Sequence, residues 1–174
     1  MSSSSRWSHL PRVGFLALAG LLALAAAGCQ VRPLYGTDSQ VQENLASIAF
    51  SPADDRVEQE VRNQLIFLTS GGAGEPSNPA YYVDMDVKVR NVGVLLEISS
   101  DTPRAGRIEV KATFSLKNVA TGEILKSGRR IAVALVDFPD QQFAKIRATR
   151  DAENRASREL AELIRADLAA WLGR

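Results

Sequence analysis

One cysteine follows an apolar segment near the beginning of the chain, and its thiol is the group there with the most distinctive chemistry. Cys29 is the only cysteine of the 174 residues, so it cannot form a disulfide within the chain. The small residues Ala-Ala-Ala-Gly precede it, and Val13 to Ala27 is apolar. This pattern resembles a bacterial lipobox, although Ala26 stands where leucine is usual, three residues before the cysteine. We therefore predict that a diacylglyceryl group is attached to the sulfur of Cys29 and that the chain is cleaved before it.

The residues before Cys29 have the three parts of a secretory signal: a positive beginning, an apolar run and small residues at the cleavage site. The apolar run is too short to span a bilayer comfortably as a helix. The sequence thus predicts a cleaved signal peptide over residues 1–28 and a mature chain held on its membrane by lipid. Gln30 follows the cysteine, and because Asp there favours inner-membrane retention, we expect sorting to the outer membrane. An ordinary secreted protein with a free thiol and an uncleaved anchor are the alternatives.

The mature chain carries almost no net charge. Arg6 and Arg12 leave with the signal peptide, so 19 basic residues face 20 acidic ones and the net charge is about −1. A nearly neutral domain has no general attraction for nucleic acid, and no nucleic-acid partner is expected. Any binding of an anion must come from a local group of cations.

Cleavage also removes His9, the only histidine. The mature chain then lacks the usual general base near neutral pH, the usual zinc ligand and the middle member of a Ser-His-Asp triad. Three close pairs of carboxylates remain: Asp54 with Asp55, Asp84 with Asp86, and Asp137 with Asp140. We interpret them as a helix start, a solvated strand face and a turn, since no catalytic or phosphate-binding motif accompanies them. The sequence predicts a protein that is not an enzyme and that has no catalytic residue, metal or cofactor.

The first half of the mature chain predicts a strand and a helix. Residues 29–43 are mostly polar and are expected to form a lipidated tether. Leu45 to Phe50 alternates as a short strand does. Asp54 or Asp55 is well suited to cap a helix that ends at Gly71. Four residues trace one apolar face of this helix, widened by two more: Val57, Val61, Leu65 and Leu68, with Ile66 and Phe67.

Three further strands follow a loop that is rich in glycine and proline. Tyr81 to Arg90 and Ile108 to Leu116 alternate apolar and polar residues, as expected of strands with one buried face. Ile124 to Val136 predicts a last strand, interrupted at Ser127-Gly128. Residues 99–106 and 118–123 are expected to be turns. Val94 to Ile98 is apolar on both faces and must be covered either by the fold or by a partner.

The end of the chain predicts one long helix, since no Gly or Pro interrupts residues 140–172. Its apolar stripe is small at first and bulky later: Ala148, Ala152, Ala156, Leu160, Leu163, Ile164 and Trp171. The predicted order is strand, helix, three strands and helix. We therefore expect residues 44–174 to form a single α+β domain, with two helices packed on a four-stranded mixed or antiparallel sheet. Such a fold leaves the other face of the sheet, or part of it, available.

Several short motifs resemble the outer-membrane LPS-assembly lipoproteins of the LptE family, particularly the shorter alphaproteobacterial form. The motifs are Cys29-Gln30-Val31-Arg32-Pro33-Leu34-Tyr35-Gly36, Asn63-Gln64-Leu65, Thr121-Gly122-Glu123, and Asp151-Ala152-Glu153 with Arg155. The first run is the most specific, and the resemblance covers the mature chain. It implies a lipid-anchored outer-membrane protein that faces the periplasm or the lumen of the LptD β-barrel. There it would plug the barrel, help it to assemble and assist the insertion of lipopolysaccharide (LPS).

The resemblance makes LPS an expected ligand, and its phosphates need cationic partners. Arg104 and Arg107 flank the predicted turn, and Lys111 shares a strand face with Arg107, so these three residues are the predicted LPS-binding group. A second cationic group, Lys126 with Arg129 and Arg130, ranks lower. An ordinary solvated basic face is the alternative interpretation.

Two other functions remain open at this point. The chain could be the lipoprotein subunit of an intermembrane lipid transporter linked to an ABC complex, or an envelope hydrolase that uses carboxylates. The proteins that copurify with it would separate the first from an LPS-assembly factor.

Overall fold

The computed structural model describes residues 39–96 and 103–173. Cys29, the signal peptide and most of the expected tether therefore lie outside the described residues. Seven elements follow one another along the chain: α2 (Ser39–Ala46), β1 (Ile48–Phe50), α3 (Arg56–Ser70), β2 (Tyr81–Leu96), β3 (Pro103–Asn118), β4 (Ile124–Asp137) and α4 (Gln142–Leu172).

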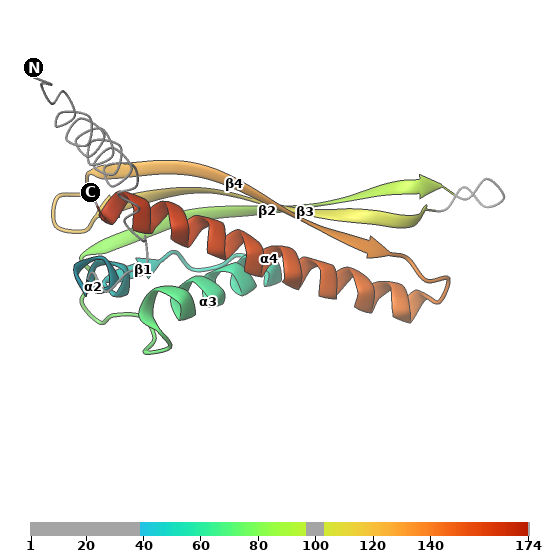
Figure 1. Ribbon diagram of the computed structural model, residues 1–174, viewed down its shortest axis with the longest axis horizontal. Coiled ribbons are helices and arrows are strands. Elements are labelled where there is room, and N and C mark those ends of the chain that lie inside the picture. Colours follow the sequence, from blue (N-terminus) through green and yellow to red (C-terminus); the bar gives the residue numbers. More distant parts are fainter. Residues whose placement is uncertain (1–38, 97–102, 174) are drawn as a thin grey trace, which may run out of the picture. The chain divides into compact units, whose positions relative to one another are not determined.

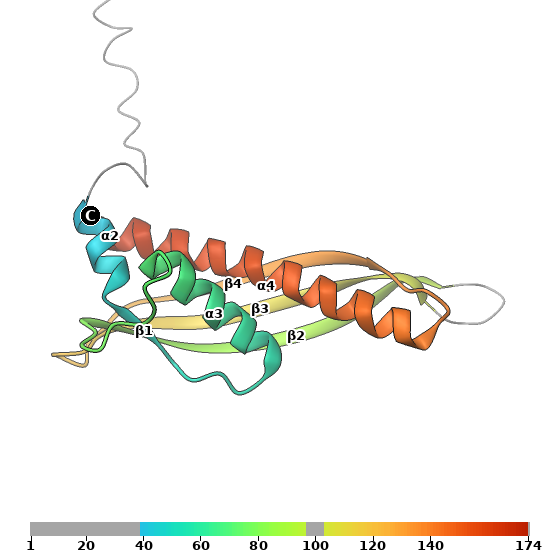
Figure 2. The same cartoon turned by 90° about the horizontal axis from the view of Figure 1, so that it is seen from below.

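The four strands form one sheet in the order β1-β2-β3-β4. β1 runs parallel to β2, and α3 is the crossover between them, whereas β2, β3 and β4 are antiparallel neighbours. Helices α3 and α4 lie on the same face of the sheet (Figures 1 and 2). This arrangement confirms the predicted α+β fold with a mixed sheet, and α2 adds a third helix to it. None of the helices within the described residues combines the length and the apolar character needed to cross a membrane.

Helix α3 begins where the sequence provides a cap. The carboxylate of Asp55 accepts hydrogen bonds from the main-chain N–H groups of Val57 and Glu58 at 2.8 and 2.9 Å. Glu58 reaches back and accepts a hydrogen bond from the N–H of Asp54 at 2.9 Å. The helix ends at Gly71, whose φ of 63° is the left-handed conformation that glycine adopts without strain. The prediction that Phe67 widens the apolar side was wrong, because 60% of this residue is exposed.

The core lies between the helices and one face of the sheet. Alternate residues of the three long strands are buried there, among them Val83, Val87, Val110 and Phe114. Ala152 and Ala156 of α4 are fully buried, and their small side chains let the helix lie close to the strands. Leu163 was predicted in the same stripe but is exposed.

The predicted interruption at Ser127-Gly128 is absent, because β4 runs without a break through both residues. Gly128 is needed for packing instead. A Cβ atom built on it would lie 2.6 Å from Cζ of Phe114, so the phenyl ring fills the space that a side chain would take. Gly106 plays the same part for the ring of Phe138, with 2.6 Å to its Cε2.

Three further boundaries differ from the predictions. Residues 39–46 form helix α2, where the end of a tether and the start of a strand were expected. β2 continues through Asn91-Val92-Gly93 to Leu96 as one strand, with bulges near its end. β3 begins at Pro103, so residues 103–106 are strand and not turn.

Candidate functional site: the open face of the sheet

The face of the sheet that is turned away from α3 and α4 is covered by none of the described elements (Figure 1), and we call it the open face. Strand alternation places these side chains on it: Tyr82, Asp84, Asp86, Lys88 and Arg90 of β2; Arg107, Glu109, Lys111, Thr113, Ser115 and Lys117 of β3; Ser127, Arg129, Ile131, Val133 and Leu135 of β4. Charged residues dominate on β2 and β3, and apolar residues dominate on the second half of β4.

Several charges of the open face are paired. Lys88 contacts Asp86 at 2.6 Å, and Arg107 contacts Glu109 at 2.8 Å. The hydrogen bond from Lys88 to Asp86, followed by the attraction between their charges, raises the pKa of Lys88 above its ordinary value. Lys88 therefore remains cationic across the physiological range.

Other cations of the open face have no ion-pair partner within residues 39–96 and 103–173. Lys111 and Arg129 are two of them, and the register brings them close together, since Lys111 is opposite Ile131 and Arg129 is opposite Thr113 on neighbouring strands. Lys88 stands directly across from Lys111 on β2. The middle of the open face therefore offers several cations to an anionic ligand.

A stripe of exposed apolar side chains on β4 borders these cations. We call Ile131, Val133 and Leu135 the β4 stripe; 53%, 44% and 72% of these residues are exposed. They stand opposite Lys111, Glu109 and Arg107 of β3, respectively. A contiguous apolar surface beside cations is typical of a binding surface and not of an ordinary solvated strand.

The structure brings together two of the three predicted LPS-binding residues. Arg107 and Lys111 both lie on the open face, next to the β4 stripe. Arg104 does not join them, because it lies three residues from Arg107 on β3 and strand alternation turns it to the other face. Its guanidinium contacts Asp140 in the connection between β4 and α4, at 3.3 Å.

The second predicted cationic group is divided in the same way. Arg129 lies on the open face, whereas Arg130 points to α4 and binds Asp167. The hydrogen bond and the charge of Asp167 hold the pKa of Arg130 above its ordinary value. The β4 stripe was not foreseen. The signal was present, since residues 131–136 are apolar at every position and a strand of that kind must be covered on both faces.

Two of the three carboxylate pairs lie as expected, at a helix start and on a solvated strand face, whereas Asp137 of the third pair is the last residue of β4 and only Asp140 lies in the connection to α4. Asp55 caps α3. Asp84 contacts Lys117 at 2.8 Å, and Asp86 contacts Lys88. Within the described residues, no three or more His, Cys, Asp or Glu side chains come together as a metal site would require.

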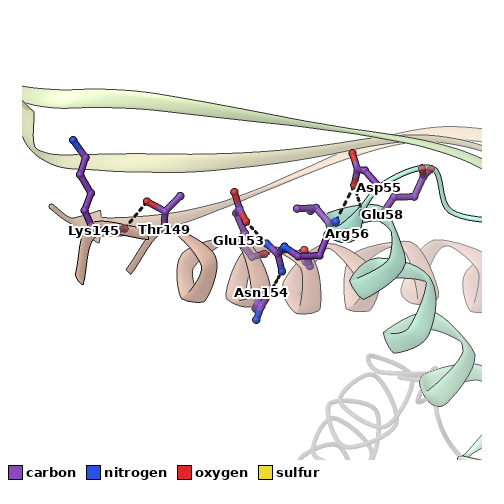
Figure 3. A network of polar contacts seen from close by, with 9 residues as sticks. Asp55, Arg56, Glu58, Lys145, Thr149, Glu153 and Asn154 are labelled. Atoms are coloured by element: carbon purple, nitrogen blue, oxygen red, sulfur yellow. Dashed lines mark hydrogen bonds and ion pairs between the residues drawn. The ribbon is translucent and has the colours of Figure 1, made fainter. Parts of the chain in front are cut away.

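Polar contacts fix α3 against α4 behind the open face. Figure 3 shows Arg56 at the start of α3 reaching across to Glu153 and Asn154 of α4. Arg56 forms an ion pair with Glu153 and donates a hydrogen bond to the side-chain oxygen of Asn154 at 2.7 Å. On the same part of α4, Arg155 binds Asp151 and also donates to the main-chain oxygen of Leu135 on β4, both at 2.9 Å. Residues of the Asp151-Ala152-Glu153 motif and Arg155 thus make polar contacts that join α4 to α3 and β4.

The fold and this site define a two-layer α+β domain in which helices cover one face of the sheet and the other face, with its cationic and apolar side chains, is covered by none of the described elements. The family described as "LptE: Lipopolysaccharide-assembly" matches residues 44–168, most of the chain. The protein therefore belongs to the LptE family of lipopolysaccharide assembly.

Solved structures have the same fold. A candidate lipoprotein from Caulobacter crescentus CB15 is 26% identical, with a TM-score of 0.66 over 78% of this chain and 97% of that one. Lipoprotein B from Nitrosomonas europaea is 14% identical, with a TM-score of 0.53 over 72% of this chain and 82% of that one. The minor lipoprotein from Acinetobacter baumannii is 13% identical, with a TM-score of 0.50 over 71% and 88%. The last two share the fold alone. Among curated proteins, no sequence matches.

Proposed function

We propose that this protein is an outer-membrane lipoprotein, anchored by lipid on Cys29, that occupies the lumen of an LptD-type β-barrel and assists both its assembly and the insertion of LPS. Membership of the LptE family supports a role in LPS assembly. The similarity to the lipoprotein from Caulobacter crescentus CB15 supports an anchor at the membrane, and residues 29–43 would connect that anchor to the folded domain. Such a protein would act by binding and not by catalysis.

The observation that carries the proposal is that cations without an ion pair within the described residues stand beside the β4 stripe on the open face. LPS has phosphate groups beside acyl chains, and Lys111 beside Ile131 offers a cation beside an apolar side chain at neighbouring positions. The charged residues of β2 and β3 also suit the polar interior of a large barrel. The phosphates of a bound ligand could pair with the cations of this face, and the polar interior of a barrel could contact the charged strands.

Direct LPS binding is tested by reversing charges on the open face. We expect Arg107→Glu with Lys111→Glu to weaken binding of LPS by the purified lipoprotein roughly tenfold or more, because two cations become anions. The matched control is Arg147→Glu with Arg150→Glu, which changes the net charge equally on the exposed side of α4. Arg104→Glu tests separately whether the third predicted residue takes part. Equal loss in the open-face and α4 variants would reject the site.

The role in barrel assembly is tested by depletion. Cells that lose this protein should show less LPS at their surface and less of the oxidised, heat-resistant form of their LptD barrel. Normal levels of both would end the assembly proposal. Copurification of an ABC-linked complex in place of an outer-membrane barrel would favour a subunit of an intermembrane lipid transporter.

A further inference from the structure

β4 is an edge strand of the described sheet, in which β3 is its neighbour. Part of its outer edge has no hydrogen-bond partner among residues 39–96 and 103–173. The N–H of Phe138 donates to the main-chain oxygen of Arg104 at 2.8 Å, so the even-numbered residues of β4 exchange hydrogen bonds with β3. The main-chain groups of the odd-numbered residues Ile131, Val133 and Leu135 consequently point outward.

A side chain from α4 covers one outward group of this edge, since Arg155 donates to the outward oxygen of Leu135 at 2.9 Å. Further along the strand, the side chain of Arg130 binds Asp167 of α4, with 2.7 Å between Nε and the carboxylate, and this pair joins β4 to α4 without covering an outward main-chain group. Between them, no donor or acceptor of residues 39–96 and 103–173 meets the outward N–H and C=O groups of Ile131 and Val133. Unpaired groups in a strand edge are a template for another strand.

A hollow of about 450 Å³ lies beside this edge. β4 and α4 line it with Arg129, Arg130, Ile131, Leu163, Ala166 and Asp167. Leu163, which strict helix periodicity assigned to the core, is exposed beside this hollow. A strand edge, an apolar floor and a helix wall are the parts with which domains bind an extended peptide by β-strand addition.

We propose that the edge of β4 at Ile131 and Val133 binds an extended segment of a partner protein as an additional antiparallel strand. An apolar side chain of that segment would enter the hollow beside Leu163, and an acidic residue would lie beside Arg129, which has no ion pair within the described residues. A second copy of this chain fits less well. In an antiparallel pair of β4 edges with Ile131 opposite Val133 of the other copy, Arg129 would stand directly opposite the apolar Leu135 and not opposite an acidic residue. This inference does not depend on LPS binding.

The experiment uses the full lipidated protein in lipid nanodiscs. The probe is an acetylated peptide in which Val and Thr alternate over six residues, followed by two Asp. We expect it to slow hydrogen exchange of the Ile131 and Val133 amides. Val133→Pro should weaken binding about tenfold or more, because proline removes an outward N–H without touching the ladder to β3. Val133→Thr keeps that N–H and should bind within about twofold of the original protein.

A charge exchange covers the case in which the proline variant fails to fold. Arg129→Glu should lose affinity for the Asp peptide and gain affinity for a peptide that ends in two Lys. The proposal is overturned if the peptide leaves both amides unprotected, or if neither Val133→Pro nor Arg129→Glu changes its affinity. Dimers of the protein that disappear in Val133→Pro would assign the edge to a second copy and would also overturn it.

Discussion

Two adjacent aspartates at the start of α3 differ in what their side chains do. The carboxylate of Asp55 accepts two main-chain hydrogen bonds, whereas Asp54 takes part only through its main-chain N–H. We expect Asp55→Ala to lower the free energy of unfolding by about 1 kcal/mol through loss of the cap. Asp54→Ala is the matched control and should stay within about 0.5 kcal/mol. Urea unfolding followed by circular dichroism checks both, and equal losses would contradict this account of the cap.

Gly128 is the second residue on which local structure depends. A methyl group at this position would collide with the ring of Phe114, so Gly128→Ala should cost about 1–3 kcal/mol of unfolding free energy. The cost should fall when Phe114→Leu is combined with it, since the smaller side chain can make room. A double-mutant cycle measures this coupling. If the two changes were additive, the collision with Phe114 would not be the reason for glycine here.

At the level of elements, α4 depends on small residues where it crosses the sheet. Ala156 is fully buried beneath the strands, whereas Glu159 on the same helix is exposed. We expect Ala156→Leu to destabilise the domain by about 1–3 kcal/mol, because the larger side chain forces the helix away from the sheet. Glu159→Leu introduces the same side chain outside the core and should change stability by less than about 0.5 kcal/mol. Thermal unfolding of the two variants compares them.

The elements that could be predicted from the sequence are those with local signals. The cap at Asp55, the glycine at the end of α3 and the alternation along β3 all lie within a few residues of the structure they specify. The continuity of β4 could not be predicted in this way, because Gly128 is explained by Phe114 on another strand. The bulges near the end of the β2–β3 pair likewise depend on the register between the two strands and not on composition.

The candidate site was predictable in part for the same reason. Arg107 and Lys111 share a strand face by simple alternation, which the sequence provides. Arg104 lies on the other face because β3 already begins at Pro103, where the sequence predicted a turn. The apolar run at residues 131–136 could be recognised in the sequence. The exposure of the β4 stripe could not, because it depends on both helices packing against the opposite face of the sheet.

At the level of the folded domain, the central feature is that the two faces of the sheet differ. One face is closed by α3 and α4, which Arg56 and Arg155 hold in place. The other places cations, among them Lys111 and Arg129, beside the β4 stripe. We therefore propose that the open face is the surface that binds during LPS assembly and that the outer side of α4 is not needed for it.

The most direct test is complementation of cells depleted of this protein, with LPS at the cell surface as the measurement. Lys111→Glu with Arg129→Glu reverses two cations of the open face that have no ion pair within the described residues, and Arg147→Glu with Arg150→Glu makes the same change on α4. At equal protein levels, the account predicts that the open-face variant fails to restore surface LPS and that the α4 variant restores it. Full restoration by both variants would contradict the claim that the open face carries the function.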